Sequence, residues 1–335
     1  MTALHTRLFD LAGCVLRFGC ADEELADRLA ADLAAFPAAP GAVPEITITA
    51  VLAAPGRARP PALLGTAKWS ILSAPPGRRL VWYPEGALCE YDYRARRGQV
   101  TSADAGLLWE LSYLLLLSRA GEALDLRGLH RLHAGALGFG GRALLLCGAQ
   151  RAGKTTLGLE LLKDKDFSLL SDDTPLIAAD GTVHGFPARI GLGGDSPHLK
   201  SFARLRAFTR RHYPPKQLLD IRGSGLELSP PLPPSYIFRL YRGVRPALRR
   251  PAAGEAAWEL ARSLVAGWGV PQMAEYFLRL SPADLCSKAR ILAARVKAAR
   301  ALAAKTQFWT FETGPDHAAN AAALKAFLRS GSAPA

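Results

Sequence analysis

The sequence predicts a mixed α/β fold with α+β character, built around a phosphate-binding loop. First, residues 148–155 fit the pattern G-x-x-x-x-G-K-[ST] and stand between an apolar strand and a helix. Second, the strands around this motif are short and close together, unlike the regular strand–helix alternation of a doubly wound fold. Third, the last part of the chain is patterned as helices. The 335 residues suffice for several regions around a sizeable core.

The N-terminal region, 1–124, is predicted to be an α+β domain. Its expected strands are 14–20, 45–53, 78–84 and 87–93, and its expected helices are 21–36 and 103–120. The most hydrophobic stretch, LLWELSYLLLL at 107–117, is too short to span a bilayer and contains Glu110. We therefore expect a buried helix there and no membrane span.

Two further regions follow. Residues 125–245 are predicted to form the phosphate-loop core, and residues 246–335 a helical C-terminal region. Core strands are expected at 132–139, 142–148, 167–173, 174–180, 182–186 and 236–243, with one clear helix at 154–163. Helices are expected at 255–268 and 283–304, followed by a strand at 307–313 and a short final helix.

Each part of the loop motif has a physical role. The two glycines permit backbone torsions closed to other residues, and the loop amides then point inward at phosphate oxygens. Lys154 adds positive charge at the β- and γ-phosphates, the Thr155 hydroxyl suits Mg²⁺, and the helix N-terminus favours the same anions. The sequence therefore predicts an ATP and Mg²⁺ site. Its expected nucleotide-binding residues are Gly148, Ala149, Gln150, Arg151, Ala152, Gly153, Lys154, Thr155 and Thr156.

Two acidic residues and a histidine are the candidate chemical partners of this loop. Asp172 and Asp173 end an apolar strand, where one carboxylate can contact Mg²⁺ while the other accepts a proton from an attacking hydroxyl. An ordinary aspartate-initiated turn is the alternative. His133 is expected at the start of a strand beside the loop strand, with either a structural role or one in proton transfer.

Basic residues after the core strands are candidates for gripping phosphate or acceptor. Lys216 lies in the loop RRHYPPK, and Arg242 ends the expected strand 236–243. A guanidinium there would stabilise charge on a transferring phosphoryl group. A solvated surface is the alternative for both.

The run HAGALGFGGRALLLCGAQRAGKTTLGLELL…FSLLSDDTPLIAADGTVHGFPARIGL, ending at 192, resembles the HPr kinase/phosphorylase family. It also resembles the HPr-kinase-like serine kinases of biosynthetic clusters, and the N-terminal region is similar to that of such relatives in peptide biosynthesis, for example lasso-peptide kinases. The shared order is a histidine at a strand start, a glycine hairpin, the phosphate loop, an Asp-Asp pair and a G-x-P turn.

The resemblance implies a core related to phosphoenolpyruvate carboxykinase and the phosphorylation of a serine hydroxyl. Lys154 would act at the phosphates, Asp172 as base, Thr155 and Asp173 on the metal, and His133 at the phosphate end. The bifunctional family members carry E-I-R-G-x-G soon after the G-x-P turn. Here that place reads ARIGLGGDSP, and a lookalike containing Arg222 comes only at 220–225. A phosphorylase reaction is therefore not implied, and Arg222 stands only as a substrate-binding candidate.

Composition adds weaker constraints. The net charge of +13 fits a phosphorylated or acidic ligand, nucleic acid or an anionic membrane, and a GC-rich coding bias toward Arg, Ala and Pro explains it equally well. The five cysteines form no C-x-x-C pair and no metal spacing, and the N-terminus lacks the pattern of a signal peptide. Both features favour a cytoplasmic protein.

The favoured function is thus an ATP-dependent kinase acting on a hydroxyl, preferably serine, of a peptide or small molecule. A nucleotide-dependent switch or ATPase and a non-catalytic peptide-binding scaffold are the alternatives. Nucleic-acid binding is supported by charge alone, without the aromatic–basic interleaving of single-strand binders. A homo-oligomer stays open, because bifunctional members of the resembling family are hexameric.

Overall fold

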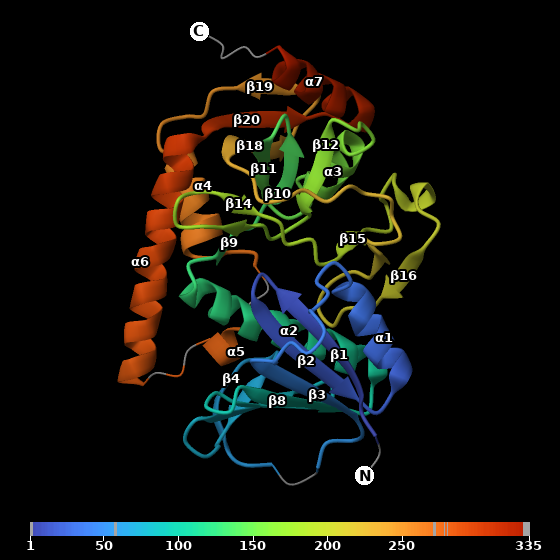
Figure 1. Cartoon of the computed structure of the whole chain (residues 1–335), viewed down its shortest axis with the longest axis vertical. Coiled ribbons are helices and arrows are strands. Elements are labelled where there is room, and N and C mark those ends of the chain that lie inside the picture. Colours follow the sequence, from blue (N-terminus) through green and yellow to red (C-terminus); the bar gives the residue numbers. More distant parts are fainter. Residues whose placement is uncertain (1–2, 57–58, 271–272, 278, 280, 331–335) are drawn as a thin grey trace. The chain divides into compact units, whose positions relative to one another are not determined.

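The computed structural model describes residues 3–56, 59–270, 273–277, 279 and 281–330. These residues form seven α-helices and four sheets, so the predicted mixed α/β class is confirmed (Figure 1). The chain divides into two compact units. The first unit comprises Met1–Leu124, Ala207–Lys216 and Pro271–Ser287, and the second comprises Asp125–Arg206, Gln217–Val270 and Lys288–Ala335.

The first unit is built on an eight-stranded sheet with the order β1-β2-β3-β8-β7-β6-β5-β4. Its strands are β1 (His5–Leu11), β2 (Cys14–Cys20), β3 (Ile46–Leu52), β4 (Ala62–Gly65), β5 (Ser70–Leu72), β6 (Arg78–Tyr83), β7 (Ala87–Asp92) and β8 (Arg97–Ser102). The neighbouring pairs β2–β3 and β3–β8 are parallel, and the pairs β1–β2 and β7–β8 are antiparallel. In β7 every second side chain is buried, because a strand places alternate residues on opposite faces.

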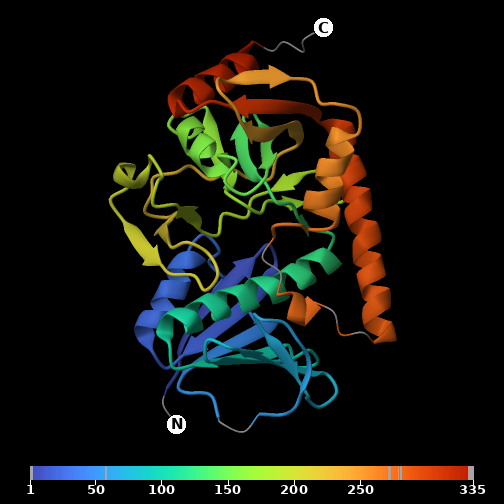
Figure 2. The ribbon, with the colours of Figure 1, turned by 180° about the vertical axis from the view of Figure 1, so that it is seen from behind.

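Three helices belong to this unit wholly or in large part. They are α1 (Glu23–Asp32), α2 (Ala105–Leu126) and α5 (Ala274–Phe277). Asp22 caps α1 by accepting a hydrogen bond from the amide of Leu25, and Asp104 accepts one from Leu107 at the start of α2. Helix α2 crosses one face of the sheet (Figure 2). Within the described residues no helix is both long enough and apolar enough to span a membrane.

The second unit contains a six-stranded sheet with the order β12-β10-β11-β18-β20-β19. Its strands are β10 (Gly135–Phe139), β11 (Arg142–Gly148), β12 (Phe167–Ser171), β18 (Pro234–Arg242), β19 (Ala247–Arg249) and β20 (Gln307–Thr313). Strands β11, β18 and β20 are parallel neighbours, so their carboxyl ends meet at one edge of the sheet. In parallel sheets this is the edge where ligands bind.

Helices cover both faces of this sheet (Figure 1). On one face lie α3 (Lys154–Leu161) and α7 (His317–Arg329), which share a hydrophobic cluster with Leu144 and Leu146 of β11. On the other face lie α4 (Glu255–Leu260), a π-helical turn (Ala261–Val265) and α6 (Pro282–Lys305), packed against Leu145 and Cys147. The continuous apolar run of β11 is thus explained by burial on both faces.

Smaller elements complete the second unit. Two three-stranded sheets have the orders β14-β13-β9 and β15-β17-β16. Their strands are β9 (His130–Arg131), β13 (Leu176–Ile177), β14 (Val183–His184), β15 (Ile190–Leu192), β16 (Leu205–Phe208) and β17 (Lys216–Leu219), and a short 3₁₀ helix spans Leu199–Ser201. The predicted strands 132–139 and 236–243 correspond to β10, which begins at Gly135, and to β18, which begins at Pro234.

A buried ionic network fastens α6 to the start of the second unit. The Asp125 carboxylate contacts the Nδ1 atom of His130 at 2.9 Å and accepts bonds from Arg295 Nε and Nη2 at 3.0 and 2.6 Å. All three side chains are almost completely buried. Burial alone would raise the pKa of Asp125, but the hydrogen bonds from His130 and Arg295 lower it overall.

Candidate nucleotide site

The loop between β11 and α3 has the backbone that the motif requires. Gly148 has φ +140°, and a Cβ atom there would lie 2.7 Å from the carbonyl oxygen of Leu240 in the neighbouring strand β18. Gly153 has φ +94° and directly precedes α3. Arg151, at the tip of the loop, also has a positive φ of 65°. Gly148 is therefore needed for close approach of two strands, and Gly153 for the turn into the helix.

Lys154 closes the mouth of the loop. Its side chain is largely buried, and its Nζ atom donates hydrogen bonds to the carbonyl oxygens of Gly148 at 3.0 Å and Ala149 at 3.2 Å. The ammonium group thus lies inside the loop, next to its first two residues and the first turn of α3. This is the position from which a lysine reaches phosphates held by loop amides.

Arg242 supports the same loop from the adjacent strand. It ends β18, and its Nε atom donates to the carbonyl oxygen of Arg151 at 3.0 Å. The neighbouring arginines have other partners, since both Arg239 and Arg249 pair with Glu255. Among these basic residues Arg242 therefore holds the loop, whereas the others tie β18 and β19 to α4.

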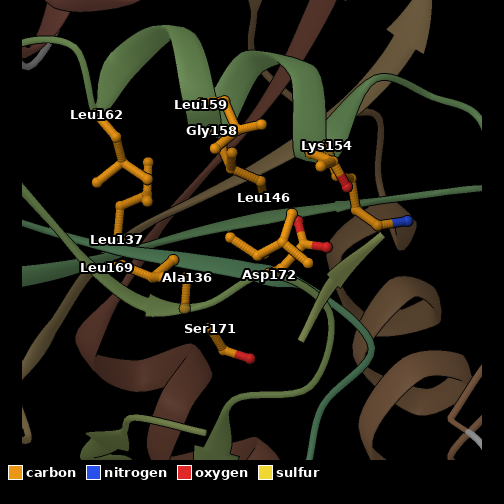
Figure 3. Close-up of a pocket in the computed structure, with 13 residues that line it drawn as sticks. Ala136, Leu137, Leu146, Lys154, Gly158, Leu159, Leu162, Leu169, Ser171 and Asp172 are labelled. Carbon is orange, nitrogen blue, oxygen red and sulfur yellow. The ribbon is translucent and has the colours of Figure 1, made fainter. Parts of the chain in front are cut away.

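Asp172 meets Lys154 and Thr155 at one small cavity. The three residues are among thirteen that line a space of about 10 Å³ beneath α3, and most of the others are apolar residues of α3 and of β10, β11 and β12 (Figure 3). That volume is roughly the room that one water molecule occupies. The turn carrying Asp172 is fixed by Ser171, whose hydroxyl donates to Phe186 O and accepts from the amide of Thr174.

His133 and Asp173 form a second pair next to this turn. His133 Nε2 lies 3.3 Å from Asp173 Oδ1, and His133 Nδ1 lies 3.1 Å from the carbonyl oxygen of Trp268. The amide of Ala134 also donates to Asp173 O, which joins the two segments through the backbone. With an oxygen at each ring nitrogen, the imidazole is held in one orientation.

Gly269 makes room for this imidazole. An ideal Cβ at position 269 would lie 1.6 Å from His133 Nδ1, and the residue has φ +87°. Any side chain at 269 would therefore displace His133. No sequence motif marks Gly269, although the two glycines of GWG at 267–269 are a signal for a turn.

The remaining candidates lie apart from this arrangement. Lys216 begins β17, and Arg222 is an exposed residue of the following turn, where its amide donates to Asp220. Neither residue lines the cavity with Asp172 or the larger pocket described below. His130 belongs to the buried Asp125 network.

The oxygen groups at the loop suit Mg²⁺ only together with a phosphate. In the described part of the chain no cluster of three or more His, Cys, Asp or Glu side chains has metal-binding geometry. Thr155 and Asp172 together offer one hydroxyl and one carboxylate at the cavity, with Asp173 next in the chain. Mg²⁺ is commonly held by one or two carboxylates plus substrate phosphates and water, so this donor set fits that ion.

When compared with models of known protein families and with curated proteins, the chain matches none of them.

Proposed function

We propose that this protein is an ATP-dependent kinase with an HPr-kinase-like core that phosphorylates a hydroxyl, preferably a serine, of a peptide or small molecule. The observation that carries the proposal is the shared cavity of Asp172, Lys154 and Thr155. A carboxylate beside the phosphate end of a glycine-bounded loop is the arrangement that phosphoryl transfer needs.

The chain's own residues would act by positioning and charge. Loop amides and Lys154 hold the triphosphate, and the N-terminus of α3 stabilises its negative charge. Asp172 accepts the proton of the acceptor hydroxyl as its oxygen bonds to the γ-phosphorus. The bond between that phosphorus and the β–γ bridging oxygen breaks, and ADP leaves. Thr155 and the aspartate pair would hold Mg²⁺, which would supply charge neutralisation at the phosphate oxygens.

His133 is a positioning residue in this proposal. It contacts Asp173 at 3.3 Å, and its other nitrogen is fixed by the Trp268 carbonyl. The orientation of Asp173 beside Asp172 thereby depends on an imidazole clamped between two oxygens.

The test is transfer of label from γ-labelled ATP with Mg²⁺ to a pool of serine-containing peptides and small hydroxyl compounds. Label on one acceptor, lost in Asp172→Asn, supports the kinase and names its acceptor class. Asp166→Asn is the matched control, because Asp166 is an exposed aspartate whose side chain pairs with Arg329. Label released only as phosphate, whatever acceptor is present, would replace the proposal with an ATPase or switch.

A further inference from the structure

A second, larger pocket lies on the opposite flank of the loop. Its volume is about 380 Å³, within the range of small-molecule sites. It is formed by the ends of β18 and β20, the first turns of α3 and α7, and the loop itself. Its lining includes Thr156 of α3, Arg242 of β18, and Pro315, His317 and Asn320 at the start of α7. The sequence motifs pointed to none of the α7 residues in this set.

The two cavities lie beside different residues at the junction of the loop and α3. Thr155 lines the small cavity with Asp172, whereas the next residue, Thr156, lines the large pocket. A nucleoside triphosphate is a linear chain with its γ-phosphate at one end and its nucleoside at the other. If the γ-phosphate faces Asp172, the nucleoside must leave the loop on the flank of Thr156.

We propose that this pocket binds the ribose and base of the nucleotide, and that it discriminates weakly between adenine and guanine. The inference rests on the proposed function, because it assumes a nucleotide with its γ-phosphate toward Asp172. None of the lining residues is acidic, and the Glu312 carboxylate, which packs against Gly243, accepts a hydrogen bond from the amide of Val244.

Two planar groups on the pocket wall can stack on a base. Arg242 lines the pocket, and its Nε bond to Arg151 O anchors the guanidinium beside the loop. His317, at the first turn of α7, supplies an imidazole on another wall. Imidazole and guanidinium planes both stack on nucleobases, and stacking tolerates any base because each has a π-face.

Three of the polar groups that could read a base edge, on Asn320, Thr313 and Gly243, are already engaged within the protein. Asn320 accepts from the amide of Gly314 and donates to the Gly314 carbonyl, at 2.8 and 2.9 Å. The Thr313 hydroxyl donates to Tyr241 O, and the amide of Gly243 donates to Thr313 O. A site must hydrogen-bond a group strongly in order to reject its absence, so this lining favours stacking over base reading.

The test compares the affinities of ATP, GTP and inorganic tripolyphosphate, each with Mg²⁺, by calorimetry on the full chain. Tripolyphosphate reports the phosphate loop alone, and the nucleotides add the pocket. We expect both nucleotides to bind at least about fivefold more tightly than tripolyphosphate, and to differ from each other by less than roughly tenfold.

Two variants test whether the extra affinity of the nucleotides comes from this pocket. His317→Ala removes the stacking plane, and Pro315→Trp, at an exposed position, narrows the mouth of the pocket. Each should weaken ATP by about fivefold or more and leave tripolyphosphate unchanged. His184→Ala is the matched control, since this half-buried histidine on β14 does not line the pocket.

The outcomes separate the two proposals. If tripolyphosphate binds as tightly as ATP, or if both pocket variants bind ATP normally, the nucleoside pocket is wrong and the phosphate site stands. A preference of roughly tenfold or more for one base would refute the weak discrimination. If the wild type binds neither tripolyphosphate nor nucleotide, the proposed function fails and the pocket assignment fails with it.

Discussion

At the scale of single residues, the phosphate loop depends on glycine at two positions for different reasons. Gly148 combines a positive φ with a collision that any Cβ would make with the β18 backbone, whereas Gly153 has only the positive φ, with no heavy atom within 4 Å of an added Cβ. Substituting alanine at each position therefore distinguishes the effect of steric contact from that of backbone strain.

We predict that Gly148→Ala lowers the free energy of unfolding more than Gly153→Ala does. Gly153→Ala should cost about 1–2 kcal/mol for the left-handed backbone. Gly148→Ala should lower the free energy of unfolding by roughly 1–3 kcal/mol more than Gly153→Ala, because β11 and β18 must move apart. Urea denaturation of both variants measures the difference, and equal losses would show that the contact with Leu240 is unimportant.

A second prediction concerns the buried carboxylate Asp125. Asp125→Asn leaves the Arg295 guanidinium buried without its counter-charge, so the free energy of unfolding should fall by about 3–5 kcal/mol at neutral pH. Asp166→Asn, in an exposed pair with Arg329, should leave stability unchanged.

The effect of Asp125→Asn should depend on pH in one direction. Because the folded pKa of Asp125 is lowered, its charge stabilises the protein above the unfolded pKa of about 3.9, and this contribution disappears as the pH falls through the folded value. Urea titrations between neutral pH and about pH 3 should therefore show wild type and variant converging in acid. A gap that stays constant in acid would contradict the role given to the carboxylate.

At the scale of elements, the loop that follows the π-helical turn holds His133 in place. Gly269→Ala puts a methyl group where the imidazole lies. We expect Gly269→Ala and His133→Ala to lower turnover to a similar extent. The affinity for nucleotide should stay within about twofold of the wild-type value, since the phosphate loop is not touched.

Gly254→Ala is the control for this experiment. It has a similar positive φ of 79° but no atom within 4 Å of its added Cβ. Measuring kcat and the Kd for nucleotide in the three variants separates backbone strain from displacement of the ring. Full turnover in Gly269→Ala would remove His133 from the site.

Sequence patterns predicted those elements whose periodicity is strong and local. The apolar run 142–148, the loop motif and the long helix α6 are examples, since each is fixed by its own residues. The prediction missed short strands such as β9, β15 and β17, which have few residues and owe their conformation to partners far along the chain. The pocket at α7 was missed for the same reason, because no local pattern relates 313–320 to the phosphate loop.

At the scale of the whole molecule, the first unit is assembled from segments far apart in the sequence. Tyr276 of α5 is fully buried and donates to Cys89 O across 187 positions, and Glu275 accepts a bond from Tyr83. The sheet of residues 5–102 is therefore completed by a helix that follows most of the second unit in the sequence.

This assembly predicts that α5 stabilises β6 and β7. Tyr276→Ala should destabilise the first unit by about 3–5 kcal/mol, and Tyr276→Phe, which keeps the ring, by about 1 kcal/mol. Hydrogen exchange of the amides in 78–92 reads the change locally. Unaltered exchange in Tyr276→Ala would mean that α5 is dispensable for this unit.

The central claim is that residues 148–156 bind a magnesium nucleotide, and calorimetric titration with Mg²⁺-ATP of wild type and Lys154→Ala tests it most directly. Circular dichroism would first establish that the variant is folded. We predict saturable binding by the wild type and affinity at least roughly a hundredfold weaker in the variant, because a charge-assisted contact to phosphate is lost. Absence of binding by the wild type, or equal binding by both proteins, would contradict the account.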